Sequence, residues 1–165
     1  MFIWDNGSMK PPVPTARDSA SLTPDNFVVM QPEVQNMTRQ ELIDYIFDEY
    51  SVEPDYPFPR DDVSCVFRHI DNRKWFGIAM VIPYRTIGIN KAGNVDILNV
   101  KCDPIMMGSF RGKTGFCPAY HMNKDKWITI LLDGSAEQGD ITALLAMSYA
   151  MTALQIRIRK QQKQK

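Results

Sequence analysis

The sequence has no apolar run that approaches the roughly 20 residues needed to cross a bilayer. It also lacks the basic start and the longer apolar stretch of a secretory signal, because the apolar residues 1–4 are followed at once by Asp5. Cysteine is scarce, and the odd set of Cys65, Cys102 and Cys117 at scattered spacing is not a disulfide framework. These absences predict reduced thiols and a cytoplasmic protein with no membrane partner.

A strong charge of either sign is also lacking, since 19 Lys and Arg balance 19 Asp and Glu. The balance is uneven along the chain. Residues 37–153 are mildly acidic, with 12 basic and 15 acidic side chains, whereas residues 154–165 carry five basic side chains and no acid. This distribution argues against a domain whose main surface is a basic field for nucleic acid. The basic tail predicts a weak electrostatic contact or simply a solvated end.

A length of 165 residues predicts one domain with an extension. Prolines repeatedly interrupt residues 1–36, which predicts an extension outside the domain. Its apolar cluster at 27–30 is expected to dock as a short extended piece, with disorder as the alternative. The folded domain is predicted at 37–155, and the basic C-terminal tail at 156–165.

The domain begins with a clear helix signal. Thr38 and Glu41 have the spacing of a capping box, and the apolar periodicity that follows predicts a helix over 38–50. Strand patterns follow at 64–70, 74–82 and 95–101. Alternation in the second of these places Phe76, Ile78, Met80 and Ile82 on one face. The connections are too short for helical crossovers, so the strands are expected to be antiparallel.

The second half continues with a short helix, a hairpin and a long helix. Asp103-Pro104 predicts a helix start, and that helix is expected to end near Gly108 or Gly112. Strands at 117–121 and 127–132 flank a turn at 123–126. Asp140 is expected to cap the last helix, whose nearly continuous apolar surface predicts burial or a protein contact. The fold class is therefore α+β: a two-layer sandwich in which helices cover one side of an antiparallel sheet of about five strands.

Five separated pieces of this chain, in the right order, resemble the MmcQ/YjbR family. The matching residues cover about 37–153 and are Tyr56-Pro57-Phe58, Lys101-Cys102-Asp103-Pro104, Tyr120-His121-Met122-Asn123-Lys124 through Trp127-Ile128-Thr129-Ile130, Leu132-Asp133-Gly134 and Ser148-Tyr149. One departure is Asp125-Lys126, where many members have His just before the Trp. The resemblance implies a bacterial protein with a CyaY-like (frataxin-related), double-wing fold. It also implies DNA binding, an expectation that rests on fold analogy, and it assigns no catalytic residue and no cofactor.

The leading candidate site is a basic patch around the hairpin. Arg111, Lys113, Lys124 and Lys126 flank the aromatic residues of the hairpin, and cations beside aromatic side chains are what a nucleic-acid wing needs. The tail would assist through Arg157, Arg159 and Lys160. The alternative is structural: the cations guard strand ends, Trp127 begins a strand and packs in the core, and Asn123 serves the turn.

Two further hypotheses remain open at this level. Glu41, Asp44 and Asp48 share one face of the first helix and could hold a hard cation or a protein partner, although most acidic helix faces are only solvated. His121, in a groove with Tyr56 and Phe58, could serve an unrecognised enzyme, although no acid or nucleophile is evident beside it.

Two apparent ligand patterns are set aside. Cys102, Cys117 and His121 lack zinc-ligand spacing, and residues 112–114 lack the glycine that a P-loop needs at position 107. The favoured hypothesis is a non-enzymatic binding protein without cofactor or metal. Its expected partners are DNA or another protein, and its expected state is a monomer or a weak dimer.

Overall fold

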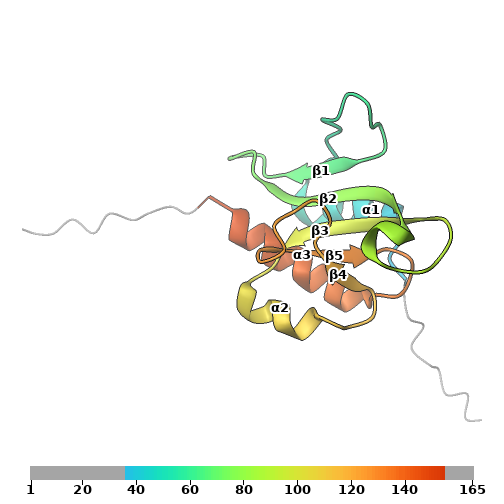
Figure 1. Ribbon diagram of the computed structural model, residues 1–165. Coiled ribbons are helices and arrows are strands. Elements are labelled where there is room, and N and C mark those ends of the chain that lie inside the picture. The colour runs from blue at the N-terminus through green and yellow to red at the C-terminus, as the bar shows by residue number, and fades with distance from the viewer. Residues whose placement is uncertain (1–35, 155–165) are drawn as a thin grey trace, which may run out of the picture. The chain divides into compact units, whose positions relative to one another are not determined.

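The computed structural model describes residues 36–154, which form a five-stranded antiparallel sheet of order β1-β2-β3-β5-β4 with three α-helices (Figure 1). The predicted α+β class is confirmed. The elements in chain order are α1 (Arg39–Tyr50), β1 (Cys65–Arg68), β2 (Trp75–Pro83), the 3-10 helix η1 (Tyr84–Ile87), β3 (Asn94–Lys101), α2 (Pro104–Phe110), β4 (Phe116–Pro118), β5 (Trp127–Leu131) and α3 (Gln138–Thr152). The predicted extension at 1–36, except Asn36, and the basic tail lie outside the described residues.

Helix α1 begins as its sequence predicts. The Thr38 hydroxyl accepts a hydrogen bond from the Glu41 amide, and the Glu41 carboxylate accepts one from the Thr38 amide at 2.7 Å. This reciprocal pair satisfies two amides that the helix itself cannot use. The pairing also lowers the pKa of Glu41. Leu42 and Ile46 are completely buried one turn apart, so α1 packs its apolar stripe against the sheet.

The main core lies between one face of the sheet and the helices. Buried side chains from α1, α2 and α3 belong to one cluster with residues of all five strands. Leu144 and Leu145 of α3 are fully buried there, and α3 packs on β2 and β3. Burial is therefore confirmed for the face of α3 that packs on the sheet, whereas Ala143, Ala146 and Ala150 are exposed, so the alternative of a protein contact stays a prediction. Among residues 36–154, no helix has the length and apolar character to cross a membrane.

Strand β2 departs from the predicted alternation. Phe76 packs in the helix-side cluster together with Ala79, whereas Ile82 and its neighbour Met80 belong to a smaller cluster on the other face with η1. The β1–β2 register shifts beside Phe67, which is the mark of a β-bulge. A bulge breaks the two-residue period, and for this reason the prediction that Phe76 shares a face with Met80 and Ile82 was wrong.

The two later helices start differently from each other. Asp103 caps α2 as predicted, because its carboxylate accepts from the Ile105 amide at 2.8 Å and Pro104 occupies the first helical position. Helix α3, by contrast, begins two residues before Asp140, with Glu137 at the N-cap and no side-chain capping bond. The prediction that Asp140 is the cap was wrong. Its carboxylate lies in the first turn, where an acid is favourable, and it accepts from the distant Lys113.

Candidate functional site between α2 and the 119–126 turn

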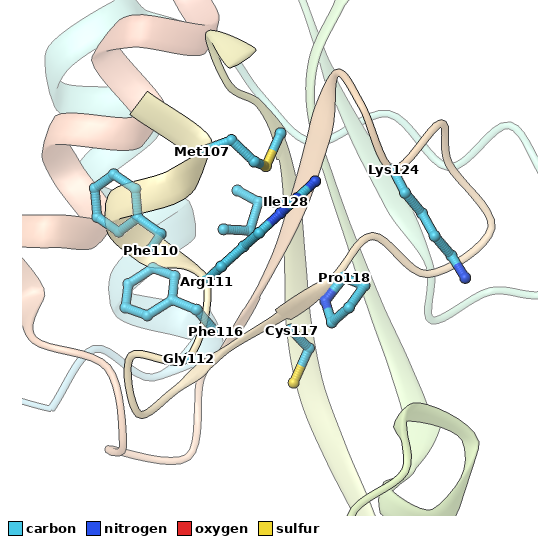
Figure 2. Close-up of a pocket in the computed structure, with 9 residues that line it drawn as sticks. All are labelled: Met107, Phe110, Arg111, Gly112, Phe116, Cys117, Pro118, Lys124 and Ile128. Atoms are coloured by element: carbon cyan, nitrogen blue, oxygen red, sulfur yellow. The ribbon is translucent and has the colours of Figure 1, made fainter. Parts of the chain in front are cut away.

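A cavity of about 400 Å³ lies between α2 and the β4–β5 hairpin (Figure 2). Its walls are mainly apolar, and two cationic side chains complete the lining. The lining residues are Met107, Phe110, Arg111, Gly112, Phe116, Cys117, Pro118, Lys124 and Ile128. A concave apolar surface with a few charged groups is the usual form of a small-ligand site.

Helix α2 and the turn that follows it build one wall. Met107 and Phe110 are buried and hold α2 against the sheet, and the Phe110 and Phe116 rings pack with centroids 5.1 Å apart. Between them, Gly112 and Gly115 both have φ of +84°. A Cβ at Gly115 would lie 2.5 Å from the Ala136 backbone nitrogen, so only glycine fits there. The chain thus reverses tightly and leaves Arg111 at the C-terminal end of α2.

The 119–126 turn builds the opposite side. The Asn123 side-chain oxygen accepts from the Asp125 amide at 2.8 Å, and the Asn123 carbonyl accepts from the Lys126 and Trp127 amides at 3.1 and 2.9 Å. Trp127 itself is buried. The structural interpretation of Asn123 and Trp127 is confirmed, and Trp127 is not available to stack on a base. The turn places Lys124 and Lys126 outward as exposed side chains.

The four predicted cations of the patch fall into two groups. Lys113 donates to Asp140 and lies 3.8 Å from the Glu137 carboxylate, and its hydrogen bond to Asp140 raises the pKa of Lys113. The other three (Arg111, Lys124 and Lys126) are exposed and have no ion-pair partner within residues 36–154. Arg157, Arg159 and Lys160 of the predicted patch lie outside the described residues.

His121 lies beside the turn in an unusual backbone conformation. Its φ is +55°, its side chain is exposed, and its ring contacts Tyr120 edge-on with centroids 4.1 Å apart. It lines a second cavity of about 360 Å³ with Thr86, Ile87, Pro118, Ala119, Tyr120 and Lys124. No carboxylate lines that cavity, so nothing in its lining orients the imidazole as a base.

The predicted groove joining His121 to Tyr56 and Phe58 is absent. Phe58 packs edge-on against Trp75 at 6.3 Å, at the start of β2. His121 follows β4, which forms the opposite edge of the sheet from β1. The order of the strands therefore separates these residues, and the prediction of a shared groove was wrong.

The acidic face of α1 does not gather into a metal site. The Glu41 carboxylate is used in the capping box, and Asp44 accepts from Gln40 at 2.8 Å. Across residues 36–154, no group of three or more His, Cys, Asp or Glu side chains is arranged to hold a metal ion. Glu41, Asp44 and Asp48 belong to no such group, so the structure adds no support to the hypothesis of a metal or protein partner on this face, and that hypothesis stays a prediction.

The Asp133-Gly134 turn that follows β5 has a structural role. Asp133 accepts from the Tyr84 hydroxyl at 2.8 Å and from Ser135, while Lys91 donates to the same hydroxyl at 2.9 Å. Burial alone would raise the pKa of Asp133, but the hydrogen bonds from Ser135 and Tyr84 outweigh it and leave the pKa below its usual value. Gly134 has φ of +86°, and a Cβ there would lie 2.7 Å from the Asn36 side chain.

Sequence reasoning found the cations but missed the cavity. Its walls come from Met107, Phe110, Phe116 and Ile128, which lie in three different elements and have no common spacing. The only local signal was the pair of aromatic residues on either side of the glycine-containing turn at 111–115. A pair of that kind indicates a packed turn but not a hollow beside it.

Together, the fold and the site define a small α+β protein with an open antiparallel sheet and a cation-rimmed apolar cavity near one edge strand. The chain belongs to the YjbR family, whose model matches residues 48–151. This confirms the family that the hairpin residues predict.

Individual relatives agree with this assignment. The uncharacterised protein YyaQ of Bacillus subtilis is 33% identical over 116 residues, which cover 70% of this chain and 98% of YyaQ. A Pseudomonas syringae protein solved by crystallography is 44% identical, with a TM-score of 0.69 over 71% of this chain and all of that one. A solution NMR structure of a Pseudomonas syringae protein, also 44% identical, has a TM-score of 0.66 over 72% of this chain and 95% of that one. A Deinococcus radiodurans protein with a DUF419 domain shares the fold at 24% identity and a TM-score of 0.52, covering 70% of this chain and 78% of that one.

Proposed function

We propose that this protein is a non-enzymatic DNA-binding protein that contacts phosphates through Arg111, Lys124 and Lys126. The observation that carries the proposal is that these three exposed cations, from the end of α2 and one turn, have no ion-pair partner within residues 36–154. Lys113 drops out of the predicted set because Asp140 and Glu137 already neutralise it. Cations without protein partners are free to displace counterions from DNA.

The same surface sets the expected strength and specificity. Residues 37–153 carry more acidic than basic side chains, so the long-range field does not favour DNA and the affinity is expected to be low. Trp127 is buried, which removes the stacking partner that would favour single strands. Contacts to phosphates alone carry no sequence information. The proposed binding is therefore weak, independent of sequence and sensitive to salt.

The proposal is tested by fluorescence anisotropy with a labelled duplex and a labelled single strand. Three phosphate contacts predict that duplex affinity falls on the order of 40-fold between about 50 and 200 mM salt. A steeper fall would show that the basic tail contributes, and neutralising Arg157, Arg159 and Lys160 would then return the slope to the three-contact value. Absence of binding even at the lower salt concentration contradicts the proposal.

A charge-matched pair of variants locates the contact. Changing Lys126→Gln removes one proposed phosphate contact. It should weaken duplex binding at low salt and reduce the fall in affinity between about 50 and 200 mM salt from about 40-fold to about 12-fold. Lys74→Gln makes the same charge change at an exposed position of the β1–β2 turn, at the opposite edge of the sheet. Equal losses in the two variants would show that only net charge matters.

A further inference from the structure

We propose that the cavity beside α2 binds one small organic anion, with a flat apolar body against the walls and a carboxylate facing Arg111 and Lys124. This inference is independent of DNA binding, although the two proposals share two cations. It concerns the apolar cavity and the two cations that line it, whereas the DNA proposal concerns the three exposed cations alone.

The walls have the chemistry and the size for an apolar body. Met107, Phe110, Phe116 and Ile128 are no more than 9% exposed, so their side chains are held in place by packing on the sheet and α2. A volume of about 400 Å³ lies within the range of small-molecule sites, which begins at about 300 Å³. Contact with these walls would bury apolar ligand surface, which is the main favourable term in such sites.

The rim has the chemistry for one anionic group. Arg111 and Lys124 line the cavity from opposite segments, and no Asp or Glu belongs to the lining. Figure 2 shows the wall residues Met107, Phe110 and Phe116 on the α2 side, and Pro118 and Lys124 on the far side. Asp125 shares a neighbouring hollow with Arg111 but forms no ion pair with it. A ligand carboxylate would therefore meet the Arg111 guanidinium, whose charge is not yet compensated. The Lys124 ammonium points away from Arg111 in Figure 2, and this exposed side chain would turn toward the carboxylate on binding.

The combination narrows the class of ligand. A hydrated inorganic anion would satisfy the cations but leave the apolar walls in contact with water. A neutral apolar molecule would fill the cavity but leave the charges of both cations uncompensated. An aryl carboxylate satisfies both parts of the site, and its rigid body loses little conformational freedom on binding.

The test uses 2-naphthoate as the probe and 2-naphthalenemethanol as its neutral counterpart, each titrated into the full chain by calorimetry. Naphthoate is expected to bind on the order of tenfold more tightly than the alcohol, because only the anion gains the charge-assisted contacts. In the R111Q/K124Q variant, naphthoate affinity should fall to the level of the alcohol, with alcohol affinity unchanged. Both substituted positions are exposed, so the variant should fold normally.

Lys126→Gln is the matched control, because Lys126 is an exposed cation of the same turn that does not line the cavity. It should leave naphthoate binding unchanged while weakening DNA binding, so the failure of one proposal can be distinguished from the failure of the other. Methyl NMR places the ligand: shifts of the Met107 and Ile128 methyl groups support the site. Absence of binding, equal affinity for acid and alcohol, or shifts confined to Ile87 in the second cavity would overturn the proposal.

Discussion

The region beneath α3 and the region between α2 and the 119–126 turn differ in how their polar groups are used. Beneath α3, His69 Nε2 lies 2.8 Å from Thr152 Oγ1, and Ser148 bridges β2 and β3. Every buried side-chain nitrogen or oxygen in residues 36–154 has a hydrogen-bond partner. At the other side, Arg111 and Lys124 line an open cavity without a charged partner. The contrast indicates that polar groups on the α3 side serve the fold, and those beside α2 remain available to a ligand.

The comparison also explains which conspicuous residues are structural. The Tyr50 ring stacks on Tyr149 at 4.3 Å, and Tyr149 packs on the His69 ring at 4.2 Å. Burial is the main cause that raises the pKa of Tyr50 to about 12, and Tyr45 and Glu49 add to it. A histidine and several tyrosines so close together suggest chemistry, yet the histidine nitrogen already has protein partners. This cluster is therefore part of the core.

The largest predicted effect comes from breaking the α3 side. Ser148 accepts from the Lys101 amide at 2.8 Å and donates to the Phe76 carbonyl. Ser148→Ala removes the partner of the buried Phe76 carbonyl and of the part-buried Lys101 amide, which should lower the free energy of unfolding by about 2–3 kcal/mol. Urea denaturation measures the loss. Ala146→Ser on the exposed face of α3 is the control, with an expected change of about 0.5 kcal/mol or less; equal losses would show that Ser148 is not a bridge.

A smaller effect is expected where the network is only partly buried. Tyr84→Phe removes the donor to Asp133 and the acceptor for Lys91, and should lower the free energy of unfolding by about 1 kcal/mol.

This substitution should also change the dependence on pH. The pKa of Asp133 is lower in the folded chain, so the unfolded chain binds more protons near pH 4 and stability is lost as the pH falls through that region. In the Tyr84→Phe variant, this acid-induced loss should be smaller, because the folded pKa of Asp133 moves toward its usual value. Thermal unfolding at several pH values from about 3 to 7 tests this. An unchanged pH profile would show that the Tyr84 hydroxyl does not hold the carboxylate.

Lys113 tests the boundary between the two regions. It belongs to the same segment as Arg111 but is paired with Asp140 and Glu137. Lys113→Gln removes an exposed ion pair, so the free energy of unfolding should fall by about 0.5 kcal/mol. DNA affinity should change less than it does in Lys126→Gln, which titration at low salt would show. A larger loss of DNA affinity from Lys113 would mean that the pair opens when the partner binds.

The smallest effect on stability is expected from the three exposed cations without an ion-pair partner in the described part of the chain. Replacing Arg111, Lys124 and Lys126 together by Gln removes no ion pair within residues 36–154, so the free energy of unfolding should change by about 0.5 kcal/mol or less. Urea denaturation beside the Ser148→Ala variant gives the comparison directly. A loss comparable to that of Ser148→Ala would show that these cations stabilise the fold.

Local signals explain what the sequence could predict. The capping box at Thr38, the Asp103-Pro104 helix start and the Asn123 turn all depend on groups within four residues of each other. The errors came from distant partners. Asp140 meets Lys113 across 27 residues, and the helix that it was expected to cap begins two residues before it.

The cavity could not be predicted for the same reason. Phe110 and Ile128 line one cavity because β4 and β5 pair beside α2, and sequence spacing does not contain that pairing. His121 and Phe58 were assigned to one groove, but β4 and β1 are opposite edges of the sheet. The sequence could predict which residues carry charge or an aromatic ring. It could not predict which of them lie side by side, because the order of the strands decides that.

The most direct test of this contrast is an amide NMR titration of the full chain with a short DNA duplex at low salt. DNA contact through Arg111, Lys124 and Lys126 should shift the amide signals of residues 111–112 and 119–126 and leave those of α1 and α3 unchanged. Changes concentrated on α1, or on the β1–β2 turn around Lys74, would contradict it.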